Sequence, residues 1–504
     1  MSLAVIYTRA SAGISAPLVT VETHLSKGLP RLSIVGLPEA AVKESKDRVR
    51  SALINTGFEY PTRRMTVNLA PADLPKEGGR FDLPIALGLL AASDQIPQEQ
   101  LTHYEFTGEL ALSGELRPIH GVLPLVLSAK QAGRKLIIPA LNAGEASVVK
   151  GANVLFAENL LQVCEFLRNG VALNQPISGE QKTNPNYSVD MADVKGQAHA
   201  KRALEIAAAG RHSLLFVGPP GTGKTMLASR LTTILPPLTE PQALEVAAVA
   251  SVSNQGFDPS KWLQIPFRSP HHSASCIALV GGGRPPKPGE ISLAHGGVLF
   301  LDELPEFGRH CLEALREPLE SGCITISRAA YQTIFPANFQ FIAAMNPCPC
   351  GYAGSARREC RCSDEQIQRY LGKLSGPLLD RIDMHVVVPS LPPGVMISQE
   401  LSGQESSEQI QARILQAREL QLLRQGKCNI ELHTREIDLH CSLEENSRRL
   451  LDQIIEKFGF SARVFHRLLK VARTIADLAG SPSINTEHLS QSLTFRCLDK
   501  IKLS

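Results

Sequence analysis

Residues 218–225, GPPGTGKT, have the types and the spacing of a phosphate-binding loop. They follow the apolar stretch SLLFVG and precede a helical pattern, so we expect a strand, a glycine-rich loop and a helix. Because glycine adopts conformations that side chains forbid, the N–H groups of such a loop can point at a phosphate. Lys224 supplies a charge for the β- and γ-phosphates of ATP, and Thr225 can place its hydroxyl on Mg²⁺. The predicted nucleotide-binding residues of the loop are Gly218, Pro219, Pro220, Gly221, Thr222, Gly223, Lys224 and Thr225.

Two carboxylates follow an apolar stretch further along the chain. The sequence VLFLDEL places Asp302 and Glu303 at the end of a predicted buried strand, where open α/β sheets bind their ligands. We expect Asp302 to bind the nucleotide through Mg²⁺, and Glu303 to orient and deprotonate the attacking water. A solvated acidic turn would explain the pair equally well on its own. The phosphate loop upstream favours the catalytic interpretation.

Three more residues are candidates for the same chemistry. Asn346 ends the apolar stretch FQFIAAMNP and can hold the water near the γ-phosphate, although a turn-forming Asn before Pro is the alternative. Arg381 in GPLLDRIDMHV can reach a neighbouring subunit's nucleotide as an arginine finger, or form an ordinary intrachain salt bridge. Arg463 lies near the start of a predicted helix, where it can sense a phosphate or belong to a basic, solvated face.

Four of the eleven cysteines lie together in the segment NPCPCGYAGSARRECRCSD. Four thiolates can close a tetrahedral Zn²⁺ site, and a reducing compartment disfavours disulfides. Pairs separated by one residue are a less common zinc spacing than pairs separated by two, so free or redox-active thiols are the alternative. The predicted structural zinc ligands are Cys348, Cys350, Cys360 and Cys362.

The elements that must position these residues fall into several domains, since 504 residues exceed a single core. Residues 1–170 alternate short β-runs with helical stretches, which predicts a separate α/β domain. Residues 171–190 have the Asn, Pro, Gly and Ser content of a linker. Residues 191–392 alternate strands and helices, which predicts a mostly parallel sheet. Residues 393–504 are helical, and one predicted helix begins behind Asn485 as its N-cap.

Composition limits the remaining possibilities without naming a partner. Lys and Arg total 52 against 49 Asp and Glu, so the net charge of +3 does not identify a nucleic-acid binder, although a local basic groove would not show in that sum. The N-terminus has no signal-peptide pattern, and no apolar run approaches about 18 residues. We therefore expect a cytoplasmic protein with no membrane-spanning segment.

Together the motifs GPPGTGKT, GGGRPPKPGEISLAHGGVLFLDEL, AAMNPCPCG, LLDRID and SARVFHRLLKVARTIADL resemble the magnesium-chelatase-related AAA+ ATPases, and closely the ComM/YifB family. The resemblance covers nearly the whole chain. It implies a Lon-protease-like N-terminal domain, an AAA+ core, a helical lid and a homo-hexameric ring. It also implies an ATP-driven branch-migration helicase that acts on DNA during natural transformation. In that family Asn346 would be sensor 1, Arg381 the finger acting in trans, and Arg463 sensor 2.

Two segments of the core suggest where such a motor would contact DNA. Residues 277–290, with ALVGGGRPPKPGE, resemble an insert of related motors, and the alternating CITISRAAYQTIFP resembles a hairpin that helicases project into their pore. Arg328, Lys287 and Arg284 could then follow phosphates, which would make binding sensitive to salt. Exposed loops are the alternative. A chelatase-like or protein-remodelling ATPase that does not act on DNA is the second interpretation of the whole chain.

The N-terminal segment resembles the proteolytic domain of Lon but lacks its nucleophile. The expected serine position holds Arg80 in PKEGGRFD, and the region of the expected lysine reads HGVLPL at residues 120–125. A Ser–Lys dyad needs a hydroxyl and an amine within hydrogen-bond reach, and neither is present at its place. We therefore predict no peptidase activity, and we interpret Lys76 and Lys130 as surface charges.

Overall fold

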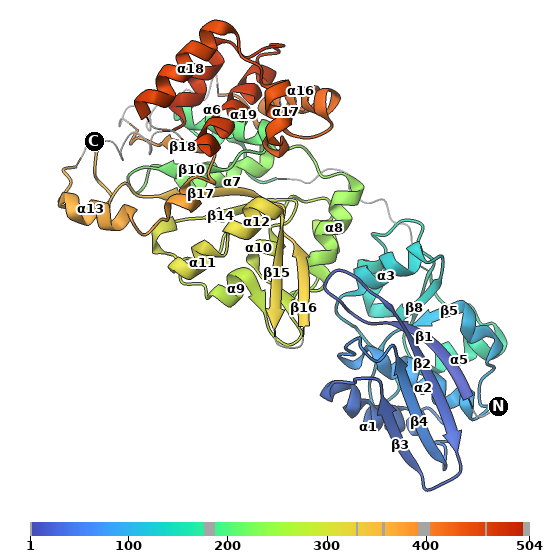
Figure 1. Cartoon of the computed structure of the whole chain (residues 1–504). Helices are drawn as coiled ribbons and strands as arrows, with labels where there is room; N and C mark the ends of the chain where they lie inside the picture. The colour runs from blue at the N-terminus through green and yellow to red at the C-terminus, as the bar shows by residue number, and fades with distance from the viewer. Residues whose placement is uncertain are drawn as a thin grey trace.

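The computed structural model describes residues 3–175, 187–328, 331–354, 358–391, 404–458 and 461–496. It confirms the predicted fold class, a mixed α/β protein with a parallel sheet at its centre and a helical C-terminal region. Figure 1 shows the N-terminal sheet in blue at the lower right, the central sheet in green and yellow, and the C-terminal helices in red above it. The predicted linker at residues 171–190 lies mostly outside the described residues, as does the start of the predicted C-terminal domain at residue 393.

The N-terminal region is built on a seven-stranded mixed sheet in the order β3-β4-β2-β1-β5-β8-β9. Strand β2 alternates buried and more exposed residues, as expected for a strand with one covered face. Its strands are β1 (Leu3–Arg9), β2 (Leu18–Ser26), β3 (Arg31–Val35), β4 (Arg64–Ala70), β5 (Tyr104–Phe106), β8 (Lys135–Pro139) and β9 (Val154–Ala157). A short pair, β6 (Glu109–Leu110) and β7 (Leu116–Arg117), lies beside it. Its helices are α1 (Ala40–Asn55), α2 (Asp82–Ala92), α3 (Val122–Gln131), α4 (Ala143–Ala146) and α5 (Leu160–Asn169).

The central sheet has five strands in the order β11-β14-β17-β10-β18, and every neighbouring pair is parallel. Strand β10 is fully buried and consists of apolar residues, as expected for a parallel strand covered on both faces. The strands are β10 (Leu214–Val217), β11 (Phe267–Arg268), β14 (Val298–Leu301), β17 (Gln340–Met345) and β18 (Met384–Val387). The helices are α6 (Ala198–Gly210), α7 (Lys224–Ile234), α8 (Glu240–Ser251), α9 (Cys276–Val280), α10 (Glu290–Leu293), α11 (Arg309–Glu313), α12 (Arg316–Ser321), α13 (Asp364–Leu371) and α14 (Gly376–Leu379).

Two antiparallel pairs extend from this core. The first joins β12 (Gly281–Gly282) to β13 (Lys287–Pro288) inside the predicted insert. The second joins β15 (Cys323–Arg328) to β16 (Tyr331–Pro336), which are the strands of the predicted hairpin. In Figure 1 this hairpin projects from the core toward the N-terminal region.

The C-terminal helices pack on the core through one apolar cluster. Ile414 of α16 and Ile475 of α19 lie in the same cluster as Phe216 and Ile342 of the central sheet. Asn485 caps the last helix, since its side chain accepts a hydrogen bond from the backbone N–H of His488. The helices are α16 (Ser407–Gln425), α17 (Thr434–His440), α18 (Glu445–Phe458), α19 (Ala462–Leu478) and α20 (Thr486–Thr494).

The N-terminal region and the core also share buried contacts. Trp262 and Ala247 of the core pack in one cluster with Val122 of α3. The backbone N–H of Gly121 donates to the carbonyl of Ser251 at 3.0 Å, so hydrogen bonds join the same surfaces. Within the described ranges, no helix combines the length and the apolar character that crossing a membrane requires.

Candidate nucleotide-binding site

The predicted phosphate loop connects the C-terminal end of β10 to the start of α7. Gly221 and Gly223 have φ values of +74° and +87°, which side chains rarely adopt. A Cβ atom on Gly218 would come within 2.3 Å of the carbonyl oxygen of Val388, so this position is sterically closed to larger residues. Glycine is therefore required at several points of the loop, as the sequence indicated.

Lys224 is folded back over this loop. Its ammonium donates to the carbonyl oxygens of Gly218 at 2.7 Å and Pro219 at 2.9 Å, and to Oδ1 of Asn346 at 3.1 Å. The residue is only 7% exposed, and burial lowers its pKa although Asp302 and Glu303 oppose that shift. The structure thus brings Lys224, at the start of α7, and Asn346, directly after β17, together over the loop that would hold the phosphates.

Thr225 and the two carboxylates meet at the same edge of the sheet. The Thr225 hydroxyl donates to Oδ2 of Asp302 at 2.6 Å, so a hydroxyl and a carboxylate oxygen converge from two elements. Hard oxygen ligands of this kind suit Mg²⁺, which keeps several of its waters and binds through few protein groups. Glu303 has a φ of +52°, which is uncommon for a residue other than glycine, and its side chain is half exposed.

A histidine that the sequence did not assign to this chemistry contacts Glu303. Nδ1 of His272 lies 3.1 Å from Oε2 of Glu303, and the His271 ring lies against the His272 ring with 4.1 Å between centroids. In the sequence the pair HH has no matching carboxylate at helical spacing, which favours a hydrogen-bonding or loop role over metal binding. The contact follows from the sheet topology. Strand β11 runs parallel to β14, so the segment after β11 reaches the end of β14 where Glu303 lies.

Arg381 lies at the opposite edge of the same sheet. It precedes the N-terminal end of β18, and β18 runs parallel to β10 with Met384 beside Leu214. Its guanidinium forms an ion pair with Glu320 and donates to the carbonyl of Pro377 at 2.7 Å. The intrachain salt bridge that the sequence allowed is therefore present. Because the phosphate loop leaves the C-terminal end of β10, Arg381 and Lys224 do not meet within one chain.

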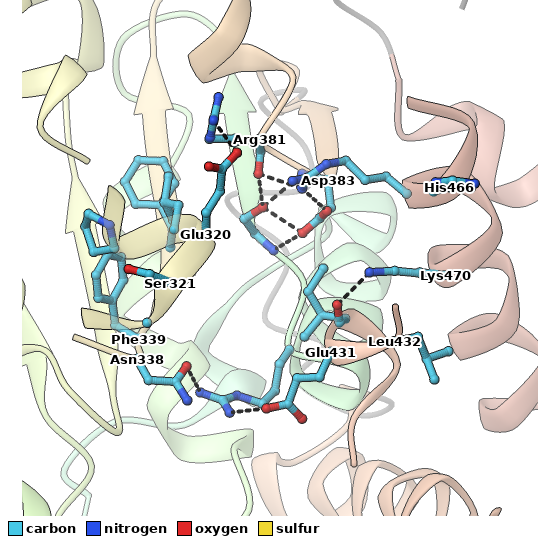
Figure 2. A pocket seen from close by; sticks show the side chains of 18 of the residues that line it. Glu320, Ser321, Asn338, Phe339, Arg381, Asp383, Glu431, Leu432, His466 and Lys470 are labelled. Atoms are coloured by element: carbon cyan, nitrogen blue, oxygen red, sulfur yellow. Dashed lines mark hydrogen bonds and ion pairs between the residues drawn. The ribbon is translucent and has the colours of Figure 1, made fainter. Parts of the chain in front are cut away.

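Arg463 lines the same cavity as Arg381, which has a volume of about 600 Å³. Figure 2 shows this cavity between α12 on one side and α19 on the other, with Arg381, Glu320 and Asp383 inside it. Among the described residues, none forms an ion pair or a hydrogen bond with Arg463. The structure therefore does not bring Arg463 to the chain's own phosphate loop. The other two arginines of that helix are engaged, Arg467 with Asp383 and Arg473 with Asp477 at 2.9 Å.

The four clustered cysteines converge, and their sulfur atoms all lie within 4.8 Å of one another. Cys348 Sγ lies 3.4 Å from Cys350 Sγ and 3.6 Å from Cys360 Sγ. Zn–S bonds of about 2.3 Å in a tetrahedron give sulfur separations of roughly 3.8 Å, so the cluster fits a zinc ion. Hydrogen bonds from the backbone of Arg361 and then Tyr352 lower the pKa of Cys350 to about 6. The donor set therefore fits the predicted metal.

The predicted DNA-contacting residues lie at a boundary between domains. Arg284 and Lys287 line a cavity of about 630 Å³ together with Glu77 and Arg80 of the N-terminal region. Nζ of Lys287 donates to Oδ1 of Asn254 at 2.7 Å. Arg328 is the last residue of β15, and its side chain lies outside the described part of the structure. The two described side chains thus face acidic groups as well as solvent.

The segment that resembles the proteolytic domain of Lon forms the other wall of this cavity. Arg80 donates through Nη2 to the carbonyl of His120 at 2.9 Å, and its buried Nη1 has no hydrogen-bond partner among the described residues. Burial raises the pKa of Glu77 to about 7. The interpretation of Lys76 as a surface charge is wrong, because Lys76 is fully buried and donates to the carbonyl of Pro71. Lys130 is exposed, as expected.

Comparison with known proteins finds similarity along nearly the whole chain. Residues 190–396 match the family described as magnesium chelatase, subunit ChlI, residues 404–496 match its C-terminal part, and residues 21–142 match subunit ChlI of Mg-chelatase. The competence protein ComM of Haemophilus influenzae is 54% identical over 99% of both chains. The uncharacterized protein YifB of Escherichia coli is 51% identical over 99% of this chain and 98% of its own. The Lon protease of Rhizobium meliloti is 28% identical over 37% of this chain and 25% of its own.

Proposed function

Because the chain belongs to the ComM/YifB family of magnesium-chelatase-related AAA+ ATPases, we propose that it is an ATP-driven DNA motor. In this proposal it is a homo-hexameric branch-migration helicase that acts on recombination intermediates during natural transformation. The competence name of the Haemophilus influenzae relative supports that setting. The observation that best supports a ring-forming motor is that Lys224 and Arg381 lie at opposite edges of one sheet.

The residues at the loop edge supply the hydrolytic chemistry. Lys224 holds a positive charge over the loop and neutralises phosphate charge, while Asn346 positions the attacking water. Glu303 accepts the proton of that water as the general base. Thr225 and Asp302 would hold Mg²⁺, which neutralises charge on the phosphates when bound. Glu303 is free for this role once its contact with His272 opens.

The opposite edge supplies the group that one chain cannot give itself. In a ring with head-to-tail contacts, the edge that carries Arg381 faces the phosphate loop of the next copy. An arginine supplied in this way stabilises the charge of the transferred phosphoryl group. Arg463 lines the same cavity, so we assign its phosphate-sensing role to the neighbouring copy's nucleotide as well.

The chelatase-like or protein-remodelling alternative is favoured by one specific observation. Arg284 and Lys287 line a cavity together with the acidic Glu39 and Glu77 of the N-terminal region. A motor that rearranges a protein partner would use the same ATPase without gripping phosphates at this insert. DNA phosphates at these two residues would therefore lie close to carboxylates of the N-terminal region.

DNA-stimulated ATP hydrolysis separates the two functions. We expect forked or four-way DNA to raise turnover, and we expect its binding to weaken steeply between low and moderate salt because phosphate contacts release counterions. Glu303→Gln should bind ATP and not hydrolyse it, whereas Lys224→Ala should lose both properties. If branched DNA neither binds with salt sensitivity nor raises turnover, the helicase proposal fails and the alternative is supported.

Three further assignments belong to the same proposal. The cysteine cluster holds a structural zinc ion, since four sulfurs within 4.8 Å match that ligand set. The N-terminal domain has no peptidase activity, because Arg80 occupies the expected nucleophile position. The protein works in the cytoplasm, where its DNA substrate is found.

A further inference from the structure

The Arg381 guanidinium is held by Glu320 in the isolated chain. The ion pair joins a buried cation, 7% exposed, to a carboxylate whose side chain is 54% exposed. Figure 2 shows the two side chains meeting at the wall of the cavity. Nε of Arg381 is buried with no hydrogen-bond partner among the described residues. The guanidinium therefore makes only part of the contacts that its five donors allow, and its main counterion is a group that water can reach.

Glu320 is not an arbitrary surface residue, because it lies at the base of the β15–β16 hairpin. It belongs to the last turn of α12, whose C-cap residue Gly322 has a φ of +68°. Strand β15 begins at the next residue, and the N–H of Ala337 donates to the carbonyl of Gly322 at 2.8 Å where the hairpin closes. The carboxylate that holds Arg381 is thus three residues from the first strand of the hairpin.

The other acids of the cavity are already engaged. Asp383 pairs with Arg467 and accepts from the Ser213 hydroxyl at 2.7 Å. Glu431 lies 3.7 Å from Arg211. Glu320 is therefore the acid that neutralises Arg381. The remaining charged residues that line the cavity are the basic Arg211, Lys427, Arg463, Arg467 and Lys470.

We propose that Glu320 is a positioning residue that holds Arg381 until a phosphate of the neighbouring copy's nucleotide displaces it, and that this exchange moves the base of the β15–β16 hairpin. The inference rests on the proposed ring and on the trans role of Arg381. A guanidinium binds phosphate in the same bidentate manner as carboxylate, so it keeps a charge-assisted partner throughout. The displaced carboxylate is half exposed and regains water. Nucleotide binding in one subunit would thereby change the position of the hairpin in the neighbouring subunit.

Glu320→Gln in the full-length protein tests this coupling, with Glu317→Gln on the same helix as the matched control. Glu317 is exposed, and no described side chain pairs with its carboxylate. We expect Glu320→Gln to raise DNA-free kcat by at least about fivefold, the lower end of common coupling effects, and to reduce stimulation by DNA. KM for ATP should change less than kcat. Glu320→Asp should restore part of the wild-type response, and Glu317→Gln should behave as wild type.

A double variant separates coupling from simple stability. In an Arg381→Ala background, which we expect to have no measurable turnover, Glu320→Gln should not restore turnover, because the group that it releases is gone. The inference is overturned if Glu320→Gln leaves DNA-free turnover and DNA stimulation unchanged, or if its effect persists without Arg381. Subunit mixing of Lys224→Ala with Arg381→Ala tests the underlying trans site separately. Recovery in that mixture together with a neutral Glu320→Gln would reject only the inference, whereas no recovery would reject the proposed shared site.

Discussion

Mixing two inactive variants is the most direct test of a site divided between neighbouring copies. Lys224→Ala removes the buried ammonium over the loop, and Arg381→Ala removes the guanidinium at the other edge of the sheet. Removing an arginine finger lowers kcat by about 10³- to 10⁵-fold. Each pure variant should therefore have no measurable turnover. Arg449→Ala, which removes an exposed arginine of α18, should retain wild-type turnover.

Mixed rings should regain activity in a predictable proportion. An interface is complete only where the Arg381→Ala chain gives the loop and the Lys224→Ala chain gives the arginine. With equal amounts and random head-to-tail assembly, roughly one quarter of the interfaces are complete. Phosphate release should therefore peak at the equal mixture, at about a quarter of the wild-type rate if the interfaces work independently.

A second mixture supplies the control for this experiment. Lys224→Ala and Glu303→Gln both damage the loop edge, so no arrangement of these two chains completes an interface. This mixture should stay inactive at every ratio. The reasoning is refuted if the Lys224→Ala and Arg381→Ala mixture shows no recovery while rings form. It is also refuted if both mixtures recover equally, since turnover would then not depend on which edge is intact.

Three more predictions follow from other parts of the chain. Cys350→Ser should lose the bound zinc, measured by metal analysis, and should melt at a lower temperature, whereas Cys323→Ser should keep both; retained zinc would contradict the four-sulfur site. Lys287→Ala should reduce the slope of log K for DNA against log salt by about 1, and an unchanged slope would remove this residue from the DNA contacts. Burial raises the pKa of Glu145 from 4.5 to about 7. The folded chain therefore keeps a proton that the unfolded chain has lost between these pH values, and stability falls as pH rises through them. Glu145→Gln should stabilise the fold by on the order of 1–3 kcal/mol at pH 8 and by nothing at pH 4, measured by thermal unfolding, and equal effects at both pH values would contradict the burial argument.

The family and the fold class were predictable from the sequence, and both are confirmed. The reason is that glycine-rich turns and apolar strand ends are local patterns. The loop at residues 218–225 requires glycine because of its backbone conformation, whatever the rest of the fold. A fully apolar strand such as β14 is typical of a parallel sheet that is covered on both faces. Predicted helix bounds held where a cap fixed them, as at Asn485. The pattern of residues 311–319 predicts one helix, and the structure instead has two, since α11 ends at Glu313 and α12 begins at Arg316.

What sequence could not give was the position of side chains that depend on how distant segments meet. The contact between His272 and Glu303 requires knowing that β11 pairs with β14. The sequence suggested that Lys76 is a surface charge, and only the packing of the tertiary structure shows that its side chain is buried. Arg463 lies on a helix whose placement against the N-terminal edge of the sheet no periodicity reveals. Its distance from Lys224 is a property of the tertiary fold.

Both groups proposed for the chemical step are engaged by their own chain. Glu303 lies 3.1 Å from His272, and Arg381 is paired with Glu320. An isolated subunit thus lacks a free general base and a free finger, in addition to lacking a neighbour. Each contact joins its group to a partially exposed partner that water can solvate, so exchange does not leave a buried charge without a counterion. The two contacts belong to different edges of the sheet, which means that a subunit's own nucleotide can open one and its neighbour's nucleotide the other. One nucleotide at an interface would then free Glu303 of the subunit that binds it and Arg381 of the neighbouring subunit, a condition that a closed ring meets and a single chain does not.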